Sequence, residues 1–183
     1  LQAYFINRVQ HIIESNGKKM IGWDEITEGQ LNKDAAVMSW QGMKGGIKAA
    51  KLGHKVVMSP TTFAYLDYIQ GDQSVENSIY ASLSLEKSYK FEPVPDSVNP
   101  KYIMGGQANL WTEVIPTLSF AYYMTYPRAL SISETLWSPK EKKNWDNFSH
   151  KILVHFNRFS KQETNISKAV LDPIVTVYKS GEK

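Results

Sequence analysis

The sequence predicts an α/β fold in which short parallel strands alternate with helices. Apolar runs with the length of buried strands occur at residues 35–40 and 55–58, and a helical pattern lies between them. The 183 residues are 42% hydrophobic and 21% charged, with 5 Trp, 10 Tyr and 7 Phe. This composition excludes a disordered chain, a collagen and a coiled coil. Strand–helix–strand order with short connections is typical of parallel βα units.

The first element is predicted to be a helix over residues 1–15. Phe5, Val9, Ile12 and Ile13 recur at the spacing of one buried helix face. Asn16 and Gly17 follow, and both residue types tolerate the left-handed conformation that ends a helix.

Four strands and one short helix are predicted next. Apolar runs predict strands at residues 19–26, 35–40, 55–58 and 102–114, the last including the loop that leaves the strand. Residues 45–52 predict a helix that ends at Gly53.

The remaining chain is predicted to be mainly helical. Residues 70–100 are polar and contain proline, so we expect an excursion with little regular structure. Residues 118–137 predict one strong helix that ends before Pro139, and residues 145–161 predict another with aromatic residues along one face. Residues 172–178 predict a strand that begins a further domain or linker.

These elements fit part of an α/β barrel. A complete (β/α)8 TIM barrel has eight strands and about 250 residues, and its site lies at the carboxyl ends of the strands. Four strands in a chain that begins at Leu1 rather than Met indicate half of such a barrel, in a piece of a longer protein. We therefore expect half of a barrel over residues 1–161, with a C-terminal helix, and a tail or linker over residues 162–183.

Each predicted strand ends in an aromatic residue, a carboxylate or both. Because strand side chains alternate, Tyr65 and Asp67 are expected on one face, as are Trp111 and Glu113. Aromatic rings stack on the apolar face of a pyranose, and carboxylates accept hydrogen bonds from its hydroxyls. A single tryptophan is more often a core filler, but several at successive strand ends favour a carbohydrate pocket. The candidate residues are Trp23, Trp40, Tyr65, Asp67, Trp111 and Glu113.

The adjacent acidic residues Asp24 and Glu25 allow two interpretations. They could act as acid and nucleophile, but neighbouring strand residues point to opposite faces. We favour one inward carboxylate together with a loop or capping interaction.

No metal, cofactor or nucleic acid is predicted. The sequence has no cysteine, and its 4 histidines lack a metal-binding spacing. A net charge of +3 without interleaved basic and aromatic residues gives no nucleic-acid signature. No apolar run approaches the roughly 18 residues of a membrane span.

Five motifs in order resemble glycoside hydrolase family 20. They are GWDE at residues 22–25, VMSWQG at 37–42, SPTTFAYLDY at 59–68, GGQANLWTE at 105–113 and YPRALSISETLWSP at 126–139. The resemblance covers residues 1–159 and is to the later strands of the family, so it implies about the last four βα units of the barrel. The family comprises exo-acting β-N-acetylhexosaminidases on a (β/α)8 barrel, so the resemblance implies N-acetylhexosamine-terminated oligosaccharides as partners.

The resemblance also implies a role for each candidate residue. Trp23 and Trp40 match tryptophans that wall the pocket for the acetamido group, and Trp111 matches the one beneath the sugar ring. Tyr65 matches the tyrosine that hydrogen-bonds the acetamido oxygen. The carboxylates that bind the hydroxyls at carbons four and six correspond to Asp67 and Glu113.

Chemistry in this family is substrate-assisted, with the acetamido oxygen as the nucleophile and retention of configuration. The family's acid and its aspartate partner lie in a His-x-Gly-Gly-Asp-Glu motif, which does not occur here, because Asp24 and Glu25 belong to the following strand. Loss of a general acid alone costs about 10²–10⁴ in rate, so we expect the isolated chain to be inactive.

Other expectations remain open at this stage. A non-catalytic sugar-binding module could use the same aromatic residues. Exposed edges of a half barrel predict a homo-oligomer or a distorted monomer. By resemblance alone, a bacterial parent would be exported to the periplasm, the cell surface or the medium.

Overall fold

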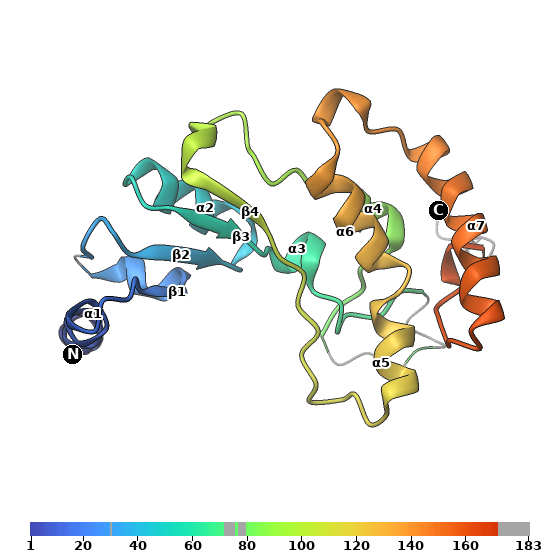
Figure 1. The fold of residues 1–183 in the computed structure, drawn as a ribbon, viewed down its shortest axis with the longest axis horizontal. Coiled ribbons are helices and arrows are strands. Elements are labelled where there is room, and N and C mark those ends of the chain that lie inside the picture. Colours follow the sequence, from blue (N-terminus) through green and yellow to red (C-terminus); the bar gives the residue numbers. More distant parts are fainter. Residues whose placement is uncertain (30, 72–75, 77–79, 172–183) are drawn as a thin grey trace, which may run out of the picture.

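A parallel sheet forms the N-terminal part of the molecule in the computed structural model (Figure 1). The structure describes residues 1–29, 31–71, 76 and 80–171. Within them the strands β1 (Ile21–Trp23), β2 (Ala36–Ser39), β3 (Val56–Met58) and β4 (Ile103–Gly106) lie side by side in chain order, all parallel. The predicted α/β class with parallel strands is therefore confirmed.

Helices flank the sheet and continue beyond it. They are α1 (Gln2–Ser15), α2 (Gly42–Lys51), α3 (Thr61–Ala64), α4 (Leu85–Tyr89), α5 (Leu118–Thr125), α6 (Arg128–Trp137) and α7 (Trp145–Lys161). Short 3₁₀ helices cover Asp24–Glu28, Pro100–Tyr102, Lys140–Lys142 and Ala169–Leu171. In Figure 1, α1 lies at the β1 end of the sheet, whereas α5, α6 and α7 lie beyond β4.

Two apolar clusters hold these elements together. The larger joins the sheet to α2 and α6, with Val37, Val56 and Met58 fully buried against Ala49 and Ile132. The smaller packs Leu85 and Tyr89 of α4 against Phe148 and Ile152 of α7. Tyr89 and Phe148 stack with their ring centroids 4.5 Å apart.

The predicted strand at residues 19–26 is shorter in the structure. It ends at Trp23, and the chain turns into the 3₁₀ helix Asp24–Glu28. The reason is tertiary: one carboxylate oxygen of Asp24 accepts backbone hydrogen bonds from Trp40 (2.8 Å) and Gln41 (2.9 Å), which draws the chain toward the end of β2.

The predicted helix over residues 118–137 is two helices. Proline lacks a backbone N–H, and the residue before it is biased to extended backbone. Tyr126 is extended, with φ −105° and ψ 142°, and α6 begins after Pro127. The break places Arg128 at the start of α6 rather than in the middle of a helix.

The segment 70–100 contains more structure than predicted. Ser84 caps α4 by accepting a hydrogen bond from the Lys87 backbone N–H, and Phe91 just beyond that helix is fully buried. The helix predicted over residues 145–161 is confirmed. The strand predicted over residues 172–178 lies outside the described residues, and the boundary at residue 161 stays a prediction.

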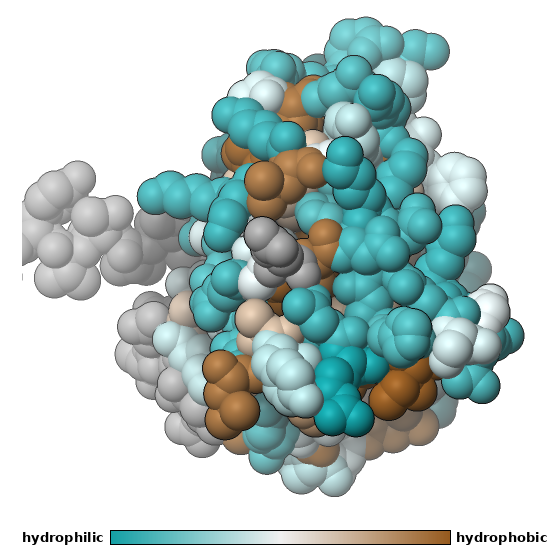
Figure 2. Space-filling view, turned by 90° about the vertical axis from the view of Figure 1, so that its left-hand side faces the viewer, coloured by the Kyte–Doolittle hydropathy of each residue, from teal (hydrophilic) through white to brown (hydrophobic). Residues whose placement is uncertain are grey.

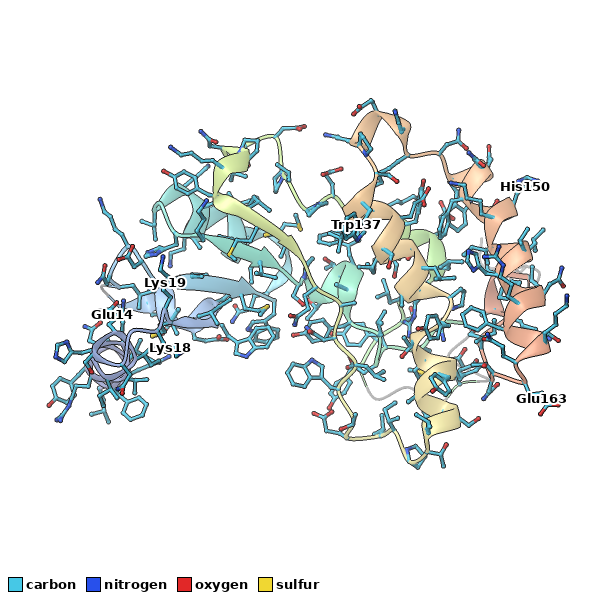
Figure 3. All side chains as sticks on the ribbon, in the orientation of Figure 1. Glu14, Lys18, Lys19, Trp137, His150 and Glu163 are labelled. Carbon is cyan, nitrogen blue, oxygen red and sulfur yellow. The ribbon has the colours of Figure 1, made fainter. Side chains whose placement is uncertain are left out.

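Several large apolar side chains remain on the surface. Phe5 and Ile12 of α1 are 63% and 58% exposed, and Figure 2, which views the α1 side, shows hydrophobic side chains scattered among polar ones. Trp137, labelled at the end of α6 in Figure 3, is 89% exposed. Among the described residues, no helix has the length and apolarity that a bilayer crossing requires.

Candidate functional site

A cavity of about 480 Å³ opens beyond the carboxyl ends of the strands. This volume lies in the usual range for a small-molecule site. All six residues predicted from the sequence line it. Its lining consists of Trp23, Glu25, Trp40, Thr61, Tyr65, Asp67, Tyr68, Tyr80, Trp111 and Glu113.

Two tryptophans reach the cavity directly from strand ends. Trp23 is the last residue of β1, and Trp40 follows the last residue of β2. Because β1 and β2 are parallel and in register, with Trp23 opposite Met38, their carboxyl ends lie at one edge of the sheet. Both indoles are half-buried, which leaves ring surface for a ligand.

Glu25 fixes the orientation of the Trp40 indole. One of its oxygens accepts hydrogen bonds from Trp40 Nε1 (3.0 Å) and from Gln41 Nε2 (2.7 Å). Neighbouring Asp24 points elsewhere, since it is buried and receives the backbone N–H groups near the start of α2. The interpretation of one inward carboxylate and one loop interaction therefore fits, and the two carboxylates do not form an acid–nucleophile pair.

Tyr65 is placed by backbone pairing rather than by a regular strand. The sequence predicted strand alternation, but Tyr65 follows the single turn of α3 and forms an isolated parallel bridge with Asn109. The Asn109 backbone N–H donates to Ala64 O (2.9 Å), and Leu66 N–H donates to Asn109 O (2.6 Å). These bonds bring Tyr65 beside the loop that carries Trp111.

The rings form a continuous wall around the cavity. The ring centroid of Tyr65 lies 6.4 Å from that of Trp40, with the rings stacked, and 6.3 Å from that of Trp111, with the rings tilted. Trp111 also lies 5.9 Å from Trp23. Residues that are far apart in the sequence therefore present ring faces and edges to one space, which suits stacking against an apolar face of a ligand.

Tyr65 is buried and keeps its phenolic proton at neutral pH. Burial raises the pKa of the hydroxyl, whereas hydrogen bonds with Trp111 and Asn109 act in the opposite direction and the negative charge of Asp67 raises the pKa further. A neutral phenol can donate a hydrogen bond to a ligand oxygen.

Asp67 is a buried acceptor in the lining of the cavity. Burial raises the pKa of its carboxyl, backbone N–H groups of Asp67 and Trp111 lower it, Glu113 raises it, and the cationic Arg128 lowers it. Oδ1 is buried and has no hydrogen-bond partner among the described residues. Since an unpartnered buried acceptor is costly, this atom is suited to receive a ligand hydroxyl.

Trp111 and Glu113 lie on the more open side of the cavity. Trp111 is 40% exposed and Glu113 is also exposed. Both belong to the loop that leaves β4, which carries no regular structure at these positions, so the predicted strand alternation does not apply to them.

Four lining residues were not among the candidates named from the sequence: Glu25, Thr61, Tyr68 and Tyr80. Thr61 and Tyr68 lie within the quoted motif at residues 59–68, which could have indicated them. Tyr80 lies in the segment predicted to have little structure, and it reaches the cavity beside Tyr68, with the ring centroids 6.3 Å apart. No local pattern at Tyr80 pointed to a site.

In the described part of the chain, no cluster of three or more His, Asp or Glu side chains is arranged to hold an ion. The arrangement supports hydrogen bonding and ring stacking with a polyhydroxylated ligand.

The chain is similar in sequence to known glycoside hydrolases. Residues 1–140 match the model for glycosyl hydrolase family 20, catalytic domain. The beta-hexosaminidase of Porphyromonas gingivalis is 41% identical over 157 residues, which cover 83% of this chain and 20% of that protein. The beta-hexosaminidase of Vibrio furnissii is 32% identical over 141 residues, which cover 73% of this chain and 23% of that protein.

A solved structure shows the same fold. The GH20 exo β-N-acetylglucosaminidase from Vibrio harveyi, in complex with N-acetylglucosamine, has a TM-score of 0.83 and 31% identity, covering 92% of this chain and 27% of that one. The predicted partial (β/α)8 barrel is confirmed. The chain spans 20–32% of the length of the first curated relatives that it matches. By its sequence and its fold, the chain belongs to glycosyl hydrolase family 20.

Proposed function

We propose that the protein containing this chain is an exo-acting β-N-acetylhexosaminidase. It would remove terminal N-acetylglucosamine or N-acetylgalactosamine from glycans. The observation that carries the proposal is that one cavity gathers Trp23, Trp40, Tyr65, Asp67 and Trp111 in its lining. Relatives named beta-hexosaminidase at up to 41% identity support the same activity.

The aromatic wall supports recognition of an acetamido group. Trp40 and Tyr65 stack beside Trp111 and enclose an apolar space that accommodates a methyl group better than a hydroxyl. The neutral Tyr65 hydroxyl would donate to the acetamido oxygen. Asp67 and Glu113 would accept hydrogen bonds from the hydroxyls at carbons four and six.

We further propose that catalysis is substrate-assisted. The acetamido oxygen of the substrate would attack the anomeric carbon as the bond to the leaving oxygen breaks, and a general acid would protonate that oxygen. Water would then open the cyclic intermediate with net retention. Tyr65 would hold the nucleophile near attack geometry, and positioning of this kind lowers the barrier substantially.

The chain by itself is proposed to be inactive, because it lacks the His-x-Gly-Gly-Asp-Glu motif that carries the family's acid. The test compares the full-length protein with residues 1–183 on 4-nitrophenyl N-acetyl-β-glucosaminide. We expect turnover by the full-length protein and none by the chain. A full-length protein that binds N-acetylglucosamine without hydrolysing it would support a carbohydrate-binding module instead.

The mechanism and the location have separate tests. A 4-nitrophenyl β-glucoside, which lacks the acetamido group, should not be hydrolysed; turnover comparable to that of the N-acetyl substrate would contradict substrate assistance. By family resemblance, the parent protein is proposed to be exported from a bacterial cell. Immunoblotting of cell fractions tests this, and confinement to the cytosol would contradict it.

A further inference from the structure

Arg128 is a fully buried cation at the first position of α6. Its guanidinium donates to four backbone carbonyls: Nη1 to Tyr68 (2.7 Å) and Leu83 (3.1 Å), and Nη2 to Leu66 (2.6 Å) and Met124 (2.6 Å). Nε is buried without a hydrogen-bond partner among the described residues. Removing a guanidinium from water costs free energy, and the four hydrogen bonds to carbonyls offset that cost.

Two of the four carbonyls belong to the loop that follows α3 at the cavity, and the other two belong to segments next to α4 and in α5. Leu66 and Tyr68 are the two residues that flank Asp67, whereas Leu83 precedes α4 and Met124 lies in the last turn of α5. One planar side chain therefore holds the carbonyls of both residues that flank Asp67, and it joins them to the chain before α4 and to the end of α5. The rigid fork of arginine suits such a task, because its donors have fixed relative directions.

A carboxylate fastens the next part of the same loop. Glu76 accepts hydrogen bonds from the backbone N–H groups of Gln70 (3.1 Å) and Gly71 (3.0 Å) and from the Tyr123 hydroxyl (3.1 Å). The Gln70 side chain in turn donates to Tyr123 O (2.5 Å). The backbone around Asp67 is thus held at several points, while Asp67 Oδ1 itself remains without a partner among the described residues.

Arg128 also acts on Asp67 through its charge. Burial lowers the pKa of Arg128 to about 9, and the nearby negative charges of Glu76 and Asp67 oppose that change. The guanidinium therefore stays cationic at neutral pH and favours the ionised form of Asp67.

We propose that Arg128 is a positioning residue for substrate binding, which orients the Asp67 carboxylate toward the cavity by holding the Leu66 and Tyr68 carbonyls. This inference rests on the proposed function and assigns Arg128 a part in recognising the sugar hydroxyls. Arg128 is not one of the residues that line the cavity, and its hydrogen bonds to that loop go to the carbonyls of Leu66 and Tyr68.

The test is a double-mutant cycle in the full-length protein. Arg128→Met and Asp67→Asn are each expected to raise KM for 4-nitrophenyl N-acetyl-β-glucosaminide about tenfold or more, with a smaller change in kcat. Because both substitutions disable one interaction, the double variant should be no worse than the poorer single variant. Arg128→Lys keeps the charge but loses the fork, and should recover only part of the affinity.

The pH profile provides a readout that a purely structural role would not change. Loss of the Arg128 charge should move the acidic limb of kcat/KM to higher pH. The groups facing Asp67 and Arg128 are Tyr65, Tyr68 and Glu113 on the cavity side and Glu76 and Tyr123 on the other. Asp67→Asn should abolish this difference between the Arg128→Met and parent proteins.

Thr135→Val is the matched control. It removes a buried hydrogen bond that α6 makes to Tyr89 O (3.2 Å), away from Asp67, and should lower thermal stability with KM and the pH profile unchanged. Where Arg128→Met does not fold, the cycle is run with Arg128→Lys. An inactive full-length parent would overturn the proposed function together with this inference. An active parent in which the two substitutions act multiplicatively, or in which Arg128→Met behaves as Thr135→Val does, would overturn this inference alone.

Discussion

At the scale of single residues, the cavity combines aromatic side chains with acceptors whose environments differ. Asp67 is buried with one oxygen unpartnered among the described residues, whereas Glu113 is exposed. Glu25 lines the same cavity, but one of its oxygens is occupied by Trp40 and Gln41. Three carboxylates in one lining therefore have three different tasks, and the hydrogen bonds around each identify the task.

Replacing Tyr65 with phenylalanine tests the proposed donor to the acetamido oxygen. The ring and its stacking on Trp40 remain, so the substitution removes only the hydroxyl. We expect kcat of the full-length protein to fall about 10²-fold, as for loss of one positioned donor. Tyr4→Phe, on the exposed surface of α1, is the control and should leave kcat unchanged. An unchanged kcat for Tyr65→Phe would contradict the proposed role.

Replacing Asp67 with asparagine is expected to stabilise the folded protein and to weaken substrate binding. Burial raises the pKa of the Asp67 carboxyl in the folded protein above its value in the unfolded chain. Ionisation of Asp67 therefore costs more free energy in the folded state, and the protein loses stability as the pH rises through the folded-state pKa. Asp67→Asn should therefore raise the melting temperature at neutral pH while raising KM. Thermal unfolding at neutral and acidic pH checks the sign: the gain should shrink toward acidic pH, where Asp67 is protonated in both states. A lower melting temperature at neutral pH would contradict it.

At the scale of elements, contacts between distant segments decide where strands and helices end. Asp24 connects the end of β1 to the backbone that precedes α2, and Arg128 connects α6 to the loop after α3. In both cases a buried charged side chain satisfies backbone groups that secondary structure leaves unpaired. The Asp24 connection explains why β1 is short, and the Arg128 connection fixes the start of α6 after the break at Pro127.

The Asp24 connection can be tested by substitution. Asp24→Ala removes two charge-assisted hydrogen bonds and leaves the Trp40 and Gln41 N–H groups without this acceptor. We expect the free energy of unfolding to fall by about 2–3 kcal/mol, measured by chemical denaturation of the full-length protein. Asp96→Ala, which removes an exposed ion pair with Lys140, should cause no measurable change. Equal stability of the two variants would show that the Asp24 connection does not stabilise the fold.

At the scale of the whole molecule, the four parallel strands of the described residues form an open sheet rather than a closed barrel. A full barrel of this class has eight strands. Apolar side chains on α1 and at the end of α6 lie on the surface, including Phe5, Ile12 and Trp137, the last of which is labelled in Figure 3. Exposed apolar surface and open sheet edges favour association.

We therefore predict that residues 1–183, expressed alone, associate into dimers or larger assemblies. Light scattering of the purified chain measures the mass directly. Replacing Phe5, Ile12 and Trp137 together with serine should shift the distribution toward monomer, whereas Val154→Ser on the exposed surface of α7 should not. A compact monomer of the unsubstituted chain would contradict the prediction.

The sequence by itself determined the α/β class, the order of the strands and the six named cavity residues, because these depend on local apolar periodicity and on motifs of contiguous residues. Only the tertiary structure decided the end of β1, the pairing of Tyr65 with Asn109 and the clamp of Arg128 on the Asp67 loop. These features join residues 16 to 62 positions apart. Hydrogen bonds between such distant groups leave no periodic signal in the sequence, so they emerge only when the chain is folded.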